Sequence, residues 1–493
     1  MTFCARWPEP AAARPTVNRV ISATDTREPD GRRGRAGAPA EPGRHSGSVP
    51  DLCAVAAAGL LLAAAALVGR SYPHAVTKLS LNWPPLYAYW RPHWGPGTPA
   101  AVLLAAAGVA YGPQLARRLS WRLLLPACWA AAMAWTWSLA LVDGWRRGVA
   151  HRLETKYEYL QSVGGPHGIH DIAATLRGFT GHILMHSPDN WPSHVAGHPP
   201  GAVLTFVLLD RVGLGGGGWA AAFVITAGSS AAAAVLVAVR ALASEEAARR
   251  AAPFAALAPS AVWTGVSADG WFTAVGGWAV ALLALAASES TRAPRTVAVC
   301  SGLAFGLVCY LSYGLVLLGL LALAVLIAAR TVRPVPYVLA GMAPWFAVFT
   351  GAGFWWFDGY TTLVRRYYEG AAAERPYGYF VWANLAAQTV VWGPALAASL
   401  RRAAVGGGAG GPADGARLPR RGAVLLLAAG AVAAVLLADV SGMSKAETER
   451  IWLPFTLWLL PATALLPERA RCGWLTAHAG LALVMNHLFL TGW

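Results

Sequence analysis

The residue types best suited to chemistry gather in one polar stretch, from Asp143 to His198, which lies between strongly apolar segments. This stretch holds seven of the twelve histidines of the chain. Its acidic residues are Asp143, Glu154, Glu158, Asp171 and Asp189. In a membrane protein, ionisable groups that gather in one loop outside the spans are typical of catalysis or binding there, whereas a transport path places such groups inside the spans.

Two carboxylates of this stretch have positions that suit a general base. Asp143 follows the apolar run that ends at Val142, so its carboxylate lies where hydrocarbon meets water and is partly desolvated. The competing interpretation is a residue that only marks the end of the span. Glu158 lies four residues after Glu154, and a helix would place both acids on one face. Such a helix could equally lie on the membrane with both acids in water.

The sequence His198-Pro-Pro-Gly201 predicts a helix that begins at its prolines. Proline is favoured in the first helical turn, and the residue before a proline is pushed toward extended backbone. His198 then lies at a helix N-terminus, which favours anions such as phosphate, although an incidental histidine before an ordinary helix gives the same pattern. Asp269 interrupts two apolar runs and is either a site residue on the same side or the cap of the following helix.

Spaced histidines raise the question of a metal site. His182 and His186, like His194 and His198, are four residues apart, as in a helix that binds a metal ion. Prolines interrupt this region and no HExxH pattern occurs, so solvated loop histidines are the favoured interpretation. No metal site is therefore predicted from these residues.

The chain around these residues has the composition of a membrane protein. Of its 493 residues, 56% are hydrophobic and 13% are charged, and its mean hydropathy is +0.45. A soluble domain carries about twice that charged fraction. Apolar runs of about 15–25 residues recur without alternation, which predicts transmembrane helices rather than barrel strands. The net charge of +15 comes mostly from arginines at span ends, and no basic face is interleaved with aromatics, so no nucleic acid is expected as a partner.

Arginine-rich connectors assign the two sides of the membrane. The connectors expected in the cytoplasm are those around Arg117, Arg249, Arg292, Arg330, Arg401 to Arg421, and Arg469. The predicted fold is all-α, a polytopic transmembrane bundle of about 13 spans plus a half-helix at Gly201 to Leu214, which is too short for an ordinary span. Its parts are a disordered basic cytoplasmic tail (1–50), N-terminal spans (51–142), the extracytoplasmic acidic and histidine-rich loop (143–198) and a C-terminal bundle (199–493).

In their order along the chain, several of these segments resemble the GT-C superfamily of integral-membrane glycosyltransferases, especially its protein mannosyltransferase and aminoarabinose transferase group. The first two are the acidic outer loop that ends in His198-Pro-Pro-Gly201 and the stretch from Asp171 to His182 within it. The others are the turn between spans from Ala258 to Asp269, the break from Tyr310 to Gly314, and a late stretch from Lys445 through Arg450 to Pro454. The resemblance covers roughly residues 140–466.

The resemblance implies transfer of a sugar, with inversion, from a polyprenyl-phosphate donor to a hydroxyl of a glycan, lipid or protein at the outer leaflet. Asp143 and Asp171 compete for the role of the base, because Asp143 has the better membrane position and Asp171 the better spacing to His198, and Glu158 is a third candidate. The departing phosphate needs cations or a helix N-terminus. The residues expected to bind the substrate are His198, Asp269, Lys445, Arg450 and Arg365. Some family members bind a divalent cation, and no other cofactor is implied.

Two other classes of function remain open from the sequence. A transporter or lipid flippase would carry ionisable residues inside its spans, and Asp210 and Asp439 lie only near the ends of apolar runs. A non-catalytic membrane scaffold has no need for several outer acids beside a helix start that favours phosphate, but it does not exclude them. The preference for arginine over lysine and the alanine-rich spans indicate a multi-pass protein of a bacterial plasma membrane, in contact with its lipids.

Overall fold

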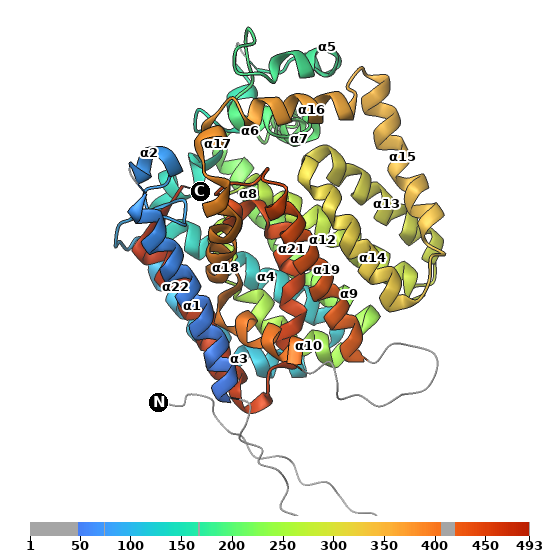
Figure 1. Cartoon of the computed structure of the whole chain (residues 1–493). Coiled ribbons are helices and arrows are strands. Elements are labelled where there is room, and N and C mark those ends of the chain that lie inside the picture. The colour runs from blue at the N-terminus through green and yellow to red at the C-terminus, as the bar shows by residue number, and fades with distance from the viewer. Residues whose placement is uncertain (1–47, 73, 166–167, 406–419, 493) are drawn as a thin grey trace, which may run out of the picture.

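The computed structural model describes residues 48–492 except 73, 166–167 and 406–419, and that part of the chain is mostly helical (Figure 1). Most of the predicted tail therefore lies outside the described residues, and its last three residues already belong to a helix. Up to the end of the polar loop, the helices are α1 (Ser48–Ser71), α2 (Ala75–Leu79), α3 (Thr98–Arg118), α4 (Trp121–Ala140), α5 (Ile172–Gly178) and α6 (Ser193–Ala196).

The rest of the chain is also helical. The next helices are α7 (Pro200–Arg211), α8 (Gly217–Ser229), α9 (Ala231–Leu242), α10 (Glu245–Ala256), α11 (Ala261–Thr264), α12 (Ala268–Ala287), α13 (Pro294–Leu311), α14 (Leu318–Ala329) and α15 (Val335–Gly351). They are followed by α16 (Trp356–Tyr367), α17 (Ala371–Glu374), α18 (Tyr377–Val405), α19 (Arg420–Val440), α20 (Thr448–Ile451), α21 (Leu453–Thr456), the 3-10 helix η8 (Leu457–Leu465) and α22 (Arg471–Leu488). The short strands β1 (Ala88–Trp90) and β2 (Phe489–Thr491) pair antiparallel and add a small sheet to the predicted all-α fold.

The described part of the chain has seven helices that are long and apolar enough to cross a membrane, or eight if α15 and α16, bent by 73°, form one span. The seven are α1, α3, α4 with the turn that follows it, α8 together with α9, α12, α13 and α19. The chain is therefore a polytopic helical membrane protein, as its composition predicts. The larger number of about 13 spans stays a prediction, because the remaining apolar helices are shorter or less apolar.

The segment after the polar loop forms the short helix that its sequence predicts. α7 has 12 residues, which is about 18 Å of helix and less than the roughly 30 Å of a bilayer core. Farther on, Arg249 of α10 donates hydrogen bonds to the carbonyls of Ala116 (2.7 Å) and Leu119 (2.8 Å). Because these carbonyls lie at the C-terminal end of α3, where its connector to α4 begins, two of the predicted cytoplasmic connectors lie at the same end of the bundle.

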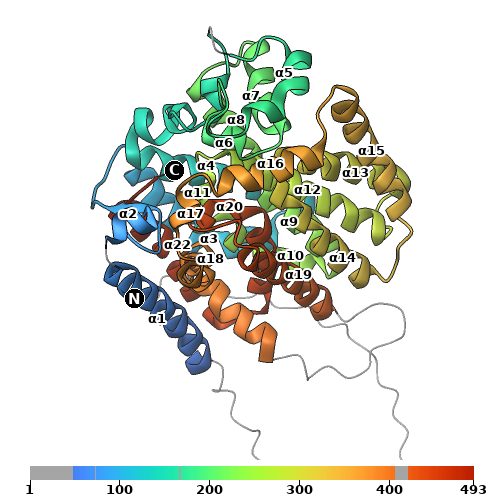
Figure 2. The same ribbon diagram turned by 45° about the horizontal axis from the view of Figure 1, so that its top comes forward.

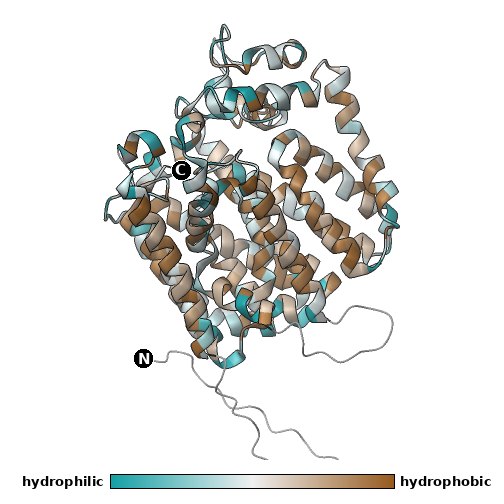
Figure 3. Ribbon diagram, viewed as in Figure 1, coloured by the Kyte–Doolittle hydropathy of each residue, from teal (hydrophilic) through white to brown (hydrophobic). Residues whose placement is uncertain are grey.

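The polar loop lies at the opposite end of the bundle from these connectors. Figure 1 shows α5, α6 and α16 at the top, and α10 with the lower ends of α1 and α3 at the bottom. At that lower end, Asp51 pairs with Arg401 and Arg402. Figure 2, in which the upper end comes forward, shows α16 and α17 lying across it. The long helices between the two ends are largely hydrophobic (Figure 3), so the arrangement agrees with the side assignment made from charge.

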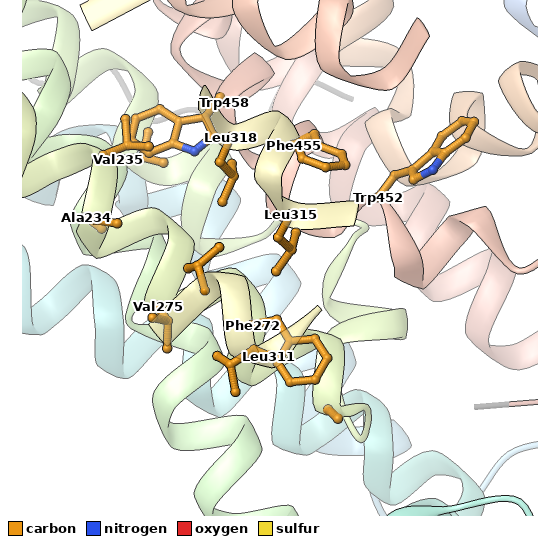
Figure 4. Close-up of a cluster of buried hydrophobic side chains, with 14 of the residues drawn as sticks. Ala234, Val235, Phe272, Val275, Leu311, Leu315, Leu318, Trp452, Phe455 and Trp458 are labelled. Atoms are coloured by element: carbon orange, nitrogen blue, oxygen red, sulfur yellow. The ribbon is translucent and has the colours of Figure 1, made fainter. Parts of the chain in front are cut away.

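The apolar core lies directly beneath the upper end and fixes the helices that carry its charged residues. Figure 4 shows Phe272 of α12 and Trp452 among the buried side chains of this core, and both are at most 1% exposed. Phe272 follows Asp269 by three residues, and Trp452 follows Arg450 by two. Each of these aromatic rings is closely packed in the core, and this packing holds the backbone next to the charged residue in place.

The side assignment makes a direct prediction for cysteine labelling of intact cells. A cysteine at Gly181, in the polar loop, is expected to react with a membrane-impermeant maleimide, because an added side chain there meets open space on the outer side. A cysteine at the exposed Arg292, between α12 and α13, should react only after the cells are opened. The unmodified chain, which has cysteines of its own, gives the background. Labelling of Arg292→Cys from outside, with Gly181→Cys protected, would reverse the topology.

Candidate functional site

The predicted helix start at His198-Pro-Pro-Gly201 is confirmed, since α7 begins at Pro200. The helix packs closely on α13, because a Cβ atom added to Gly201 would lie 2.5 Å from the carbonyl oxygen of Tyr310. A glycine is therefore required for this approach. The contact brings the start of α7 against the stretch that begins at Tyr310, two segments that the sequence analysis names separately. His198 is partly buried beside Phe272, with ring centroids 5.5 Å apart, and its Nδ1 lies 2.7 Å from the carbonyl oxygen of His194.

Asp269 and Arg450 form a buried ion pair at the centre of the site, with an Nη1–Oδ2 distance of 2.6 Å. Asp269 does not cap α12, because the side chain of Ser267 does so by accepting from the Asp269 amide. The other Nη atom of Arg450 lies 2.9 Å from Glu447 Oε2 and 3.1 Å from His194 Nε2. Burial alone would lower the pKa of Arg450, but Asp269 and Glu447 outweigh it and raise the pKa above its usual range. Arg450 is therefore a permanent cation.

Glu158 joins this network through His194. Glu158 Oε1 lies 2.8 Å from Nδ1 of His194, whose Nε2 faces Arg450. Because an arginine can only donate, Nε2 must accept and Nδ1 must carry the proton that His194 donates to Glu158. The hydrogen bonds thus run in one direction, from Arg450 to His194 to Glu158. The second carboxylate oxygen of Glu158, Oε2, is buried and has no hydrogen-bond partner among the described residues.

Asp143 forms a second buried ion cluster beside the first. Its Oδ1 lies 2.7 Å from His93 Nε2, and its Oδ2 lies 2.7 Å from a terminal nitrogen of Arg152. Arg152 also donates to the carbonyl of Thr491 in β2, at 3.1 Å, which ties the polar loop to the end of the chain. Burial lowers the pKa of Arg152 to about 10, although the attraction of Asp143 opposes this effect, and Glu158 is close enough to act in the same sense as Asp143. Both oxygens of Asp143 are therefore occupied.

Lys445 is buried two residues before Glu447 in the chain. Its Nζ donates to the carbonyl of Ala372 at 2.9 Å and lies 5.4 Å from the ring centroid of Tyr368. Arg375 connects Lys445 with Glu447, since it donates to the carbonyl of Lys445 at 2.6 Å and lies 3.8 Å from the Glu447 carboxylate. Arg375 and Lys445 thus add two cations beside Arg450.

Glu449 is buried next to Arg450 in sequence. It accepts a hydrogen bond from the Tyr87 amide at 3.1 Å, and its other oxygen is buried without a partner in the part of the chain that is described. Burial raises the pKa of Glu449 to about 7. This carboxyl therefore exchanges its proton near neutral pH, as an acid or base in catalysis must.

Two of the residues expected at the site lie apart from this network. Asp171 is exposed and caps α5, where its side chain accepts from the Ala174 amide at 3.0 Å. Arg365 is exposed on α16. The expected helix with Glu154 and Glu158 on one face is wrong. The chain forms separate 3-10 turns there, Glu154 accepts from the Gly217 amide at the start of α8, and Glu158 turns toward His194.

Sequence reasoning missed several members of the network. They are His93, Arg152, His194, Arg375, Glu447 and Glu449. His194 left a signal, because it lies four residues before His198, and α6 with the turn after it places both beside Tyr159. Arg152 lies in the polar stretch, and Glu447 and Glu449 lie beside Arg450 in the late stretch. His93 and Arg375 come from other segments, and no local pattern relates them to the site. No group of three or more His, Cys, Asp or Glu side chains in the described ranges could hold a metal ion.

The burial of His198 predicts a specific pH dependence of stability. Burial lowers the pKa of His198 from 6.5 to about 4, so between these values the unfolded chain binds a proton that the folded chain does not. Stability should therefore fall as the pH drops through this window. The His198→Gln variant should lose up to about 3 kcal/mol less stability than the wild type over the same change of pH. Thermal unfolding of both proteins in detergent at pH 7 and pH 4.5 measures the difference.

The comparison between the two proteins also controls for Glu449. Its raised pKa acts in the opposite direction, because a carboxyl with a raised pKa loses stability as the pH rises from 4.5 to about 7. This contribution is common to both proteins and cancels. Identical pH profiles for the two would show that His198 is not held neutral by burial.

At neutral pH His198 is thus uncharged, and it does not supply the cation that its place in the motif suggests. Within the network, Arg450, Arg375, Lys445 and Arg152 supply positive charge. Compared with models of protein families and with curated proteins, the chain has no match.

Proposed function

We propose that this chain is an inverting membrane glycosyltransferase of the GT-C type, with about 13 spans, that moves a sugar from a polyprenyl-phosphate donor to an acceptor hydroxyl at the outer leaflet. The observation that carries the proposal is the directed chain from Arg450 through His194 to Glu158, which ends in a buried carboxylate oxygen without a partner. Leaving such an acceptor unsatisfied costs about 1–3 kcal/mol, so it is typical of a functional group that waits for a substrate.

In the proposed reaction, the Glu158 end of this network acts on the acceptor and the Arg450 end acts on the donor phosphate. The Glu158 carboxylate takes the proton of the acceptor hydroxyl as its oxygen forms a bond to the anomeric carbon of the sugar. The bond from that carbon to the phosphate oxygen breaks, and the electron pair leaves with the polyprenyl phosphate. Arg450 and Lys445 offer positive charge to the departing phosphate, which is where preorganised cations contribute most to the rate.

Asp143 and Asp269 hold the cations of the site in this mechanism. Asp269 orients Arg450, and Asp143 orients Arg152 close to Glu158. Glu158 is preferred over Asp143 as the base because both oxygens of Asp143 already have partners. Asp171 is not used, since it caps an exposed helix.

A transport function would need ionisable groups within the spans. The best candidate is Asp439, buried in α19, which accepts a hydrogen bond from Asn384 at 2.9 Å. Asp439 lies one residue before the end of its helix, and Asn384 also donates to the carbonyl of Ser444, in the turn that leads to Lys445. This pair therefore belongs with the residues at the upper end and does not mark a path through the bundle.

Purified protein in liposomes, supplied with a panel of polyprenyl-phosphate sugars and with acceptor glycans, lipids and peptides, tests the proposal. We expect one donor to lose its sugar to an acceptor, with inverted anomeric configuration, and the deletion strain to lack the same glycan. Movement of the intact donor between leaflets without cleavage would instead support a flippase. The absence of both reactions with every donor would contradict an enzymatic role.

A further inference from the structure

A second polar feature lies at the other end of the bundle, among the predicted cytoplasmic connectors. The ends of α3, α10 and α22 enclose a pocket of about 240 Å³. Its charged lining residues are Arg117, Arg249, Arg250, Arg471, Glu246 and Glu468. Four arginines against two glutamates leave an excess of two positive charges in a small space. Nothing in the proposed transfer reaction uses this pocket, so it calls for an explanation of its own.

The arginines of this pocket differ in how far the protein itself satisfies them. Arg249 has a structural role, because it pairs with Glu245 and donates to the two carbonyls at the end of α3. Arg250 pairs closely with Glu246, and Arg117 lies 3.4 Å from Glu468 in an exposed pair that contributes little. Arg471 donates from Nε to the carbonyl of Leu466 at 3.2 Å. Glu468 and Glu246 act on its charge from nearby, but neither forms a hydrogen bond or close ion pair with its two terminal nitrogens among the described residues.

The surface beside the pocket is apolar and faces outward. α3 buries only 17% of its apolar window inside the protein, and it exposes Tyr111 and Leu115 next to Pro113 and Arg117, which line the pocket. A ligand that combines negative charge with long apolar chains matches both surfaces. Basic pockets at the cytoplasmic ends of transmembrane helices bind the head groups of anionic lipids.

We propose that this pocket binds the phosphate head group of an anionic phospholipid from the cytoplasmic leaflet, with Arg471 and Arg250 as its main contacts and the acyl chains along α3. The phosphodiester of the head group carries one negative charge, which offsets part of the positive excess, and its oxygens accept from the terminal nitrogens of Arg471. The site is remote from Glu158 and Arg450, so this proposal does not depend on the proposed transfer reaction.

Native mass spectrometry of the purified full chain, titrated with phosphatidylglycerol or phosphatidylcholine, tests the proposal. We expect one phosphatidylglycerol to remain bound where phosphatidylcholine does not. The double variant Arg250→Gln/Arg471→Gln should weaken its binding by about tenfold or more, since each basic residue near an anionic lipid contributes about 1 kcal/mol. The matched control, Arg118→Gln/Arg292→Gln, removes the same charge from exposed residues outside the pocket and should bind as the wild type does.

A variant with the opposite charge change guards against a loss caused by misfolding. Glu246→Gln adds to the positive excess of the pocket and should tighten phosphatidylglycerol binding. Equal weakening in the control variant would show general attraction to the basic face and overturn the site, as would equal retention of the two lipids. Displacement of phosphatidylglycerol by millimolar inorganic phosphate would identify a free anion, rather than a lipid, as the ligand and would also overturn the proposal.

Discussion

Glu158→Gln is expected to lower the rate of sugar transfer by about 10²–10⁴-fold while the protein stays folded and still binds its donor. The substitution keeps the shape of the side chain and its contact with His194, but it removes the basic oxygen that lacks a protein partner. A lost base affects turnover and leaves ground-state binding of the lipid-phosphate donor nearly unchanged. Single-turnover transfer and donor binding, measured on the same preparation, separate the two effects.

Asp171→Asn is the matched control for this prediction. It also converts an acid of the same loop to its amide, but at an exposed N-cap where asparagine caps as well as aspartate. We expect wild-type transfer from it. If Glu158→Gln transfers normally while a folded Asp143→Asn variant does not, the base is Asp143 and the directed chain from Arg450 serves another purpose.

Arg450→Gln is expected to reduce stability by about 3–5 kcal/mol and to abolish transfer, because it leaves Asp269 buried without its cation and leaves Glu447 with Arg375 alone. The buried position of Arg450, 5% exposed, prevents water from replacing the lost partner. Thermal unfolding in detergent and the transfer assay measure the two losses. Arg450→Lys keeps the charge but not the forked geometry that reaches three partners, so it should fall between the wild type and Arg450→Gln.

A double variant tests whether the loss comes from the ion pair itself. Asp269→Asn removes the charge that Arg450→Gln leaves unpaired, so the combined variant should lose clearly less stability than the sum of the two single losses. Arg365→Gln, an arginine change on the exposed face of α16, should change stability by no more than about 0.5 kcal/mol. Additive losses at Asp269 and Arg450 would show that the two side chains do not stabilise each other.

The sequence alone determined the features that depend on local physics. Long apolar runs predict membrane-spanning helices because the backbone in lipid must satisfy its own hydrogen bonds, and the structure has seven such helices in its described part. The prolines after His198 predict the start of α7, and the length of the run after them predicts a helix too short to span. The arginine connectors predict the two polar ends of the bundle, because their charge stays on one side of the membrane.

Only the tertiary structure decided which ionisable residues meet. Asp143 and Asp171 are equivalent candidates in the sequence, yet one is buried between His93 and Arg152 and the other caps an exposed helix. Glu158 and Arg450 are almost three hundred residues apart, and His194 connects them only because α12 and the segment around Trp452 pack into one core beneath them. Pairing of buried charges depends on contacts between distant segments, and the packing of the helices, which no local pattern encodes, brings those segments together.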